Sequence, residues 1–206
     1  MFDIASMIYR VPALLFAITI HEYAHAAVAD SEGDPTARFM GRLTFNPMAH
    51  MDPIGALLLI TTGFGWARPV TVNPTNFRHG KTSRLKVAFA GPAANLFLTF
   101  LTCVVFTLMA KFRMLSPTVS HFLMSMIWIN VWFAFFNLIP IPPLDGSQIL
   151  EEFLPYNKLW DYRNIVDRYG FFILIALVFM GVTNAIIKPL ASLYVGIIST
   201  VLNMIF

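Results

Sequence analysis

Charged residues are scarce in this sequence. Only 12% of its 206 residues are charged and 57% are hydrophobic, whereas a typical soluble domain is about 25% charged. This composition excludes an ordinary soluble domain and predicts an integral membrane protein whose surroundings are a lipid bilayer.

Cysteine is almost absent, and internal repeats and low-complexity segments are missing. Cys103 is the single cysteine, so an intrachain disulfide framework is excluded. The basic residues cluster in loops instead of alternating with aromatic residues, which argues against a nucleic-acid partner. Together these absences predict a single membrane-embedded domain over residues 1–206.

Long apolar runs are abundant instead. About 20 apolar residues cross a bilayer core of ~30 Å as a helix. Five runs approach or exceed this length, with Lys188-Pro189 between the last two: residues 4–29, 85–110, 118–139, 170–187 and 190–206. We therefore expect an all-α integral membrane protein with about five transmembrane helices. The first run lacks a signal-peptide cleavage pattern, so we expect it to remain in the mature chain.

The region 54–72 is too short and too broken to cross the membrane. Apolar residues at 54–60 precede Gly63 and Gly65, and β-branched residues alternate after them, which predicts a β-hairpin loop. Such backbone at membrane depth must be buried in protein or line a water-filled cavity. Two placements are open, a re-entrant hairpin beside the functional site or an interfacial loop anchored by Phe64 and Trp66.

The first apolar run carries three ionisable residues within little more than one helical turn. It contains HEYAH, with His21, Glu22 and His25. Residues four apart share a helix face, so both imidazoles can bind one Zn²⁺ while the carboxylate acts as general base. The alternative is a chance match whose polar groups pair with another helix. Because ionisable groups within a membrane span are costly, we favour a zinc site with one ion per chain.

A catalytic zinc site of this kind needs a third protein ligand. Asp145 is the best candidate, because it follows three helix-breaking prolines and precedes Gly146, where the backbone can turn sharply. The alternative is that Asp145 and Gln148 form a capping box. Weaker candidates for the metal site are His50 and the acidic residues Asp30, Asp52, Glu151 and Glu152.

Three motifs occur together in this chain. They are HEYAH at 21–25, GPAAN at 91–95 and NLIPIPPLDG at 137–146. In this combination the chain resembles the site-2 protease family over roughly residues 17–146. The resemblance includes a loop at 41–53 that is similar to short bacterial members.

The resemblance implies a site and a reaction. Zinc is expected on His21, His25 and Asp145, with Glu22 as the general base and Asn137 as a polar group near the substrate carbonyl. The implied function is a zinc-dependent endopeptidase that hydrolyses peptide bonds in or near transmembrane segments of another protein, by regulated intramembrane proteolysis. The implied location is the bacterial inner membrane.

The chain also departs from many family members. It has room for neither the PDZ nor the CBS domain that many of them carry, and we expect no extra helix before the catalytic one. We therefore expect a three-helix catalytic core within residues 4–146, followed by C-terminal helices within 170–206.

Asparagines in the apolar runs are open to two interpretations. Asn95 could bond across a helix interface, the commoner role of Asn in a bilayer, or it could contact the substrate or a zinc ligand. Asn130 and Asn184 are interpreted as packing residues.

A different function class would use the same ionisable groups. A membrane transporter or metal-permeation protein could pass ions along intramembrane His, Glu and Asp side chains. Duplicated halves are usual in transporters and none is visible here, so the protease is favoured. The Lys and Arg distribution predicts that the N-terminus lies outside the cytoplasm, and that the zinc site and the C-terminus both lie at the cytoplasmic side.

Overall fold

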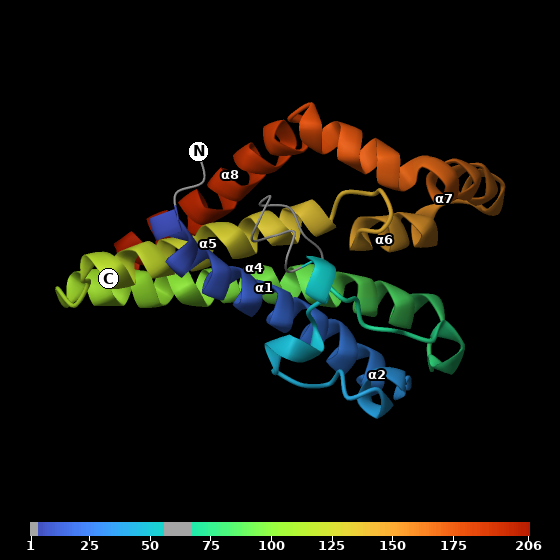
Figure 1. The fold of residues 1–206 in the computed structure, drawn as a ribbon, viewed down its shortest axis with the longest axis horizontal. Coiled ribbons are helices and arrows are strands. Elements are labelled where there is room, and N and C mark those ends of the chain that lie inside the picture. Colours follow the sequence, from blue (N-terminus) through green and yellow to red (C-terminus); the bar gives the residue numbers. More distant parts are fainter. Residues whose placement is uncertain (1–3, 56–66) are drawn as a thin grey trace.

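The computed structural model describes residues 4–55 and 67–206, and over these residues its regular secondary structure is helical, with one isolated antiparallel bridge (Figure 1). The elements are α1 (Ile4–Ser31), α2 (Thr36–Phe39), η1 (Pro47–Ala49), η2 (Pro74–Asn76), α4 (Lys81–Lys111), α5 (Pro117–Asn137), α6 (Asp145–Phe153), α7 (Tyr156–Phe179) and α8 (Val182–Ile205). The expected all-α class is therefore confirmed for the described residues.

Four of the described helices, α1, α4, α5 and α8, are long and apolar enough to cross a membrane. α7 has a comparable length of 24 residues, but charged residues crowd its stretch 158–168. They are Lys158, Asp161, Arg163, Asp167 and Arg168. The described part of the chain thus supplies four candidate spans, and the expected count of about five is not confirmed.

α1, α4 and α5 pack against one another. Figure 1 shows α1 and α5 running in the same direction and α4 running opposite to both. Small residues on α1 let its neighbours approach closely, as is usual between membrane helices. The fully buried ones are Ala13, Ala17, Ala26 and Ala29. This arrangement brings the end of α1, the start of α4 and the end of α5 to one end of the bundle.

α8 packs across α4 and α5 through two small apolar clusters. One contains Cys103, Ile127, Ile198 and Leu202, and the other contains Val131, Ile187 and Ala191. The Lys111 ammonium lies 5.7 Å from the ring centroid of Phe206, so α8 ends beside the end of α4. The expectation that the C-terminus lies at the same end as the candidate site is therefore wrong.

The turn between the last two helices is also placed differently from the prediction. α7 ends at Phe179 and α8 begins at Val182, whereas a break was expected at Lys188-Pro189. Gly181 supplies the turn with a left-handed φ of 73°, a conformation that costs glycine little. Pro189 lies inside α8, as membrane helices tolerate when neighbouring groups compensate the lost hydrogen bond.

The predicted hairpin at 54–72 falls largely on residues 56–66, which lie outside the described residues together with its expected anchors Phe64 and Trp66. Its flanks are described. Met51 and Ala67 form the antiparallel bridge, and the Arg68 N–H donates to the His50 carbonyl at 2.9 Å. The chain therefore enters and leaves this segment at one place.

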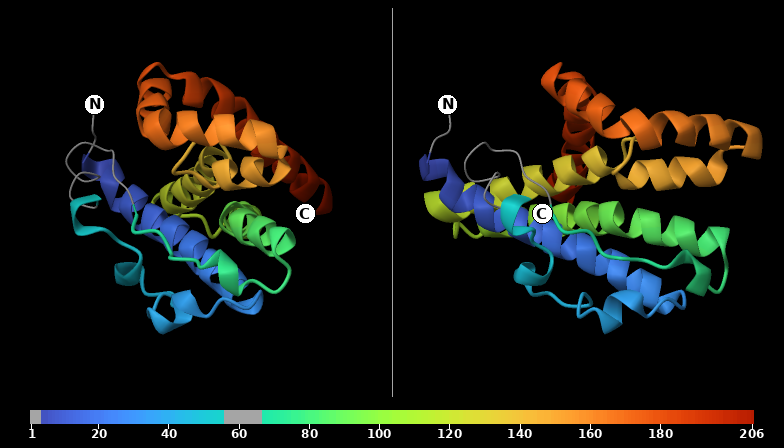
Figure 2. Two further views of the ribbon diagram at one scale, coloured as in Figure 1. Left: turned by 90° about the vertical axis from the view of Figure 1, so that its right-hand side faces the viewer. Right: turned by 45° about the vertical axis from the view of Figure 1, so that its right-hand side comes forward.

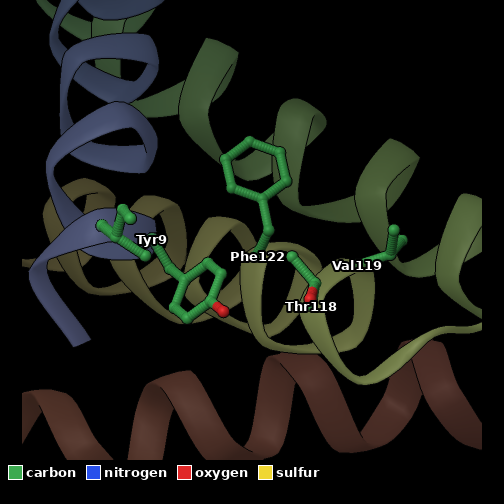
Figure 3. Close-up of a pocket in the computed structure, with 5 residues that line it drawn as sticks. Tyr9, Thr118, Val119 and Phe122 are labelled. Atoms are coloured by element: carbon green, nitrogen blue, oxygen red, sulfur yellow. The ribbon is translucent and has the colours of Figure 1, made fainter. Parts of the chain in front are cut away.

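A pocket of about 410 Å³ opens between the starts of α1 and α5 (Figure 3). It is lined by Ile8, Tyr9, Thr118, Val119 and Phe122. No carboxylate, thiol or imidazole belongs to this described lining. The two histidines that could bind a metal lie further along α1.

Candidate metal centre

Three side chains from distant parts of the chain meet among the helices. His21 and His25 on α1 and Asp145 at the start of α6 are all buried. The Nε2 atoms of the two imidazoles lie 3.1 Å apart. Oδ2 of Asp145 lies 3.1 Å from Nε2 of His21 and 3.2 Å from Nε2 of His25. The three atoms thus form a nearly equilateral triangle.

Local structure explains how each ligand atom reaches the triangle. His21 and His25 are four residues apart, so they project from the same face of α1. Asp145 returns toward them because the chain folds tightly back on the end of α5. A Cβ added to Gly146 would lie 2.3 Å from the carbonyl oxygen of Leu138 and 2.5 Å from that of Ile139. Only glycine fits this close approach.

The carboxylate of Asp145 does not cap its helix. The N-cap of α6 is Leu144, and no side-chain cap hydrogen bond is present there, so the capping-box alternative is wrong. The four rival carboxylates have other partners. Asp30 pairs with Arg38, Asp52 accepts the N–H groups of Ile54 and Gly55, Glu151 pairs with Arg163, and Glu152 pairs with Arg84.

Hydrogen bonds at the far side of each ring determine which imidazole nitrogen carries the proton. Nδ1 of His25 lies 2.7 Å from the carbonyl oxygen of Val87, which can only accept, so this Nδ1 carries a proton. Nδ1 of His21 lies 2.7 Å from Oδ1 of Asn95 and donates in the same way. In neutral rings both Nε2 atoms therefore present lone pairs.

The resulting donor set fits a metal ion. Two imidazole lone pairs and one carboxylate oxygen face one another at 3.1–3.2 Å, an arrangement that is repulsive without a cation between them. Ligands at 2.0–2.1 Å from a tetrahedral zinc ion are about 3.3–3.4 Å apart, and two His with one carboxylate is a known catalytic set. The residues present therefore fit zinc.

α4 approaches the triangle through a glycine. A Cβ built on Gly91 would lie 2.4 Å from Nε2 of His25 and 2.6 Å from Nε2 of His21. Any larger residue would collide with the ligand atoms. Gly91 therefore borders the metal centre itself.

Asn95 contacts a candidate ligand directly. Besides the bond to His21, its Nδ2 donates to the Ala17 carbonyl at 2.9 Å and to Oδ1 of Asn130 at 2.8 Å. Asn95 thus combines the two sequence interpretations, because it bonds across helix interfaces and also contacts the candidate ligand His21. From the sequence, Asn130 was interpreted only as a packing residue. The sequence signal that could have indicated a polar contact is its position two turns before Asn137, on the same face of α5.

Two other candidate residues form hydrogen bonds to backbone carbonyls. Asn137 donates from Nδ2 to the Phe133 carbonyl of its own helix at 2.9 Å. His50 is fully buried, and its Nε2 lies 2.8 Å from the carbonyl oxygen of Thr44. Among the described residues the metal-ligand group consists of His21, His25 and Asp145, so His50 does not complete it.

Glu22 lies next to the ligands without joining them. Its side chain is buried, and Oε2 accepts the backbone N–H of Val70 at 2.8 Å. This bond holds the chain after the bridge at Ala67 against α1. Among the described residues, the second carboxylate oxygen makes no hydrogen bond.

Fold and site together define a class of protein: a helical membrane protein with a buried two-histidine, one-carboxylate metal centre and a neighbouring glutamate. Residues 107–177 match the sequence profile of Peptidase family M50. No solved structure matches this chain.

Three bacterial relatives cover more of the chain. YwhC of Bacillus subtilis, named as a zinc metalloprotease, is 36% identical over 194 residues, which are 92% of this chain and 88% of YwhC. Rip2 of Mycolicibacterium smegmatis and of Mycobacterium tuberculosis H37Rv, named likewise, are 32% and 30% identical; each match covers 68% of this chain and 55% of Rip2. The chain belongs to peptidase family M50, the site-2 proteases, and is a multi-pass membrane metalloprotease.

Proposed function

We propose that this protein is a zinc-dependent intramembrane endopeptidase that hydrolyses peptide bonds in or near transmembrane segments of other membrane proteins. The observation that carries the proposal is the buried triangle of His21, His25 and Asp145, formed among helices long enough to cross a membrane. The zinc-metalloprotease names of the relatives support zinc as the cofactor.

The ligand residues have defined roles in this proposal. His21, His25 and Asp145 hold the zinc ion, and the bonds at both Nδ1 atoms keep the Nε2 lone pairs directed inward. Zinc supplies, when bound, Lewis-acid activation of water and of a peptide carbonyl. The burial of all three ligands strengthens these electrostatic effects.

Glu22 is proposed as the proton carrier. One of its oxygens is engaged by the Val70 N–H, so the other takes a proton from the attacking water and later delivers it to the leaving amine nitrogen. Its place next to His21 puts this carboxylate beside the metal ligands. Asn137 is proposed to donate to the substrate carbonyl, although its Nδ2 now bonds within its own helix.

The substrate is proposed to be a transmembrane helix of another protein, cleaved in the course of regulated intramembrane proteolysis in the bacterial inner membrane. The bond between Val70 and Glu22 supports the re-entrant placement of the 54–72 region over the interfacial one, because it holds residue 70 against a buried carboxylate. Backbone at such depth is tolerated when it is buried in protein.

The transporter alternative is less well supported. An ion path needs groups that release their ion easily, whereas here both imidazoles are fixed by a second hydrogen bond and closely bounded by Gly91. Such rigidity suits a resident metal ion.

The experiment combines zinc quantification with cleavage of single-span membrane proteins. Glu22→Gln should abolish cleavage and retain zinc, because Glu22 carries protons and is not a ligand; its amide oxygen can still accept the Val70 N–H. His21→Ala and Asp145→Ala should lose zinc. Asp161→Asn, at an exposed carboxylate of α7, is the control and should change neither.

Two results would contradict the proposal. One is cleavage at the wild-type rate by Glu22→Gln. The other is full zinc occupancy in both His21→Ala and Asp145→Ala.

A further inference from the structure

Asn130 lies in the middle of α5 and is completely buried. Its Nδ2 donates to the Met126 carbonyl one turn earlier at 2.8 Å, and its Oδ1 accepts from Nδ2 of Asn95 at 2.8 Å. Asn95 in turn contacts His21 at 2.7 Å. An unbroken chain of hydrogen bonds therefore runs from the backbone of α5 to a metal ligand on α1.

The direction of this chain is fixed at its backbone ends. The Met126 carbonyl can only accept, so Asn130 must present its amide N–H to Met126 and its oxygen to Asn95. The two N–H groups of Asn95 are then used by Asn130 and by the Ala17 carbonyl. Only the oxygen of Asn95 remains for His21. Reversing the Asn95 amide would set two pairs of oxygen atoms against each other at hydrogen-bond distance.

We propose that Asn130 is a positioning residue of the metal centre, acting through Asn95 on the orientation of His21. The inference rests on the proposed zinc site and adds a residue to it. Asn130 belongs to α5, the helix that leads directly into the Asp145 segment. The Asn130–Asn95–His21 chain thus ties the helix carrying two ligands to the helix that precedes the third.

A purely structural role of Asn130 and Asn95 would differ from the positioning of His21. Two buried amides can stabilise a membrane helix pair by bonding across it. That role needs no third partner. Here the acceptor oxygen of Asn95 reaches His21 and no other side chain among its described hydrogen bonds. Loss of partners behind metal-binding histidines typically costs about 10- to 100-fold in metal affinity.

The test compares Asn130→Leu and Asn130→Thr with wild type in the full-length, detergent-solubilised protein. Leucine removes both bonds. Threonine can still donate to its own helix, as Thr99 and Thr102 do in α4, but is too short to reach Asn95, so it keeps the fold and breaks the link. Thr102→Val is the matched control, since it removes a buried bond to the Leu98 carbonyl away from the chain to His21.

The readouts are the zinc dissociation constant, from competition with a chelator, and the visible absorption spectrum after Co²⁺ substitution, which reports ligand geometry. Both Asn130 variants should bind zinc about 10- to 100-fold more weakly and show an altered cobalt spectrum. Thr102→Val should match wild type. Because Asn130 acts through Asn95, the double variant of Asn130→Leu with Asn95→Leu should be no worse than Asn95→Leu alone.

The inference is overturned if either folded Asn130 variant keeps the wild-type zinc affinity and cobalt spectrum, or if the double variant is additive. His21→Ala separates this failure from that of the proposed function. If His21→Ala loses zinc while the Asn130 variants do not, only the positioning role is wrong. If His21→Ala also keeps zinc, the metal site itself is wrong.

Discussion

Gly91 leaves room for two imidazole rings where a side chain would have none. The ideal Cβ position lies 2.4 Å from Nε2 of His25, so Gly91→Ala must displace a ligand or move α4. We expect this variant to lose most of its zinc, although alanine favours a helix over glycine by about 0.5–1 kcal/mol. Zinc content and the thermal unfolding midpoint, measured on the same sample, check the prediction.

Gly196 is the control for this substitution. It also lies inside a membrane-span candidate, α8, but nothing lies within 4 Å of its ideal Cβ position. Gly196→Ala should keep its zinc and be as stable as wild type or more so. Equal zinc binding by both alanine variants would show that α4 does not bound the metal site closely.

Part of the candidate site could be predicted from sequence because its spacing is local. His21 and His25 share a helix face by periodicity alone, and the prolines before Asp145 indicated a break. The role of Asn130 could not be found in this way. Its hydrogen-bond partners lie on α5 itself and on α4, and it reaches His21 on α1 only through Asn95, so the contact depends on how the helices are rotated about their axes.

At the scale of elements, two carboxylates join the end of α1 to the chain that leads into α4. Glu32 accepts from Ser83 at 2.6 Å and from Lys86 at 2.5 Å. Asp34 accepts the Asn73 N–H at 2.6 Å and an amide N–H of Asn76 at 2.8 Å. The bonds of Asp34 hold the chain shortly after Val70, the partner of Glu22.

Both carboxylates have a depressed pKa. The bonds from Lys86 and Ser83 lower the pKa of Glu32. For Asp34, burial would raise the pKa, but the bonds from Thr36, Asn73 and Asn76 together outweigh it. A carboxylate with a depressed pKa contributes stability above its unfolded pKa of about 4, and this contribution is lost as pH falls through the folded value.

We therefore expect the thermal unfolding midpoint to fall as pH drops below about 4. Asp34→Asn and Glu32→Gln should lower the midpoint at neutral pH and make its decline in acid shallower. The exposed carboxylate of Asp161 provides the control, and Asp161→Asn should follow the wild-type curve. Parallel curves for all four proteins would show that neither Glu32 nor Asp34 is stabilised by ionisation.

Helices were easier to predict than their ends. Apolar runs gave the spans α1, α4, α5 and α8 in outline, because their length and hydropathy are set by the bilayer. The turn at Gly181 was missed because Pro189 is the stronger breaker in a soluble helix. In α8 the surrounding helices make that proline tolerable.

At the scale of the whole molecule, the metal triangle constrains how often the chain crosses the membrane. His25 lies near the end of α1 and Asp145 follows the end of α5, so an even number of crossings must separate them, and α4 and α5 supply two. The hydrogen bonds between Arg84 and Glu152 place the start of α4 at the same end of the molecule as α6. At that end α6 and α7 lie side by side (Figure 2).

The far end of the molecule is identified by α4 itself. Its 31 residues extend about 1.5 Å each, so Lys111 lies more than a bilayer core away from Arg84. Phe206 lies beside Lys111, which places the C-terminus at this far end. Most Lys and Arg residues belong to the loops and helix starts at the metal end, so the positive-inside rule predicts that this end is cytoplasmic.

Cysteine labelling in a Cys103→Ala background tests this topology. Thr82, Ser116, Asn157 and Asn203 are all exposed in the structure, so a cysteine at any of them should react with a membrane-impermeant thiol reagent from one side only. We expect positions 82 and 157 to react from the cytoplasmic side and positions 116 and 203 from the opposite side.

Labelling of 82 and 157 from opposite sides would mean that His25 and Asp145 cannot meet, and the ligand triangle would have to be abandoned. Labelling of 203 from the same side as 82 would instead mean that only the direction of α8 in the membrane is wrong. The triangle would stand, because it depends on α1, α4, α5 and α6 and on no residue of α8.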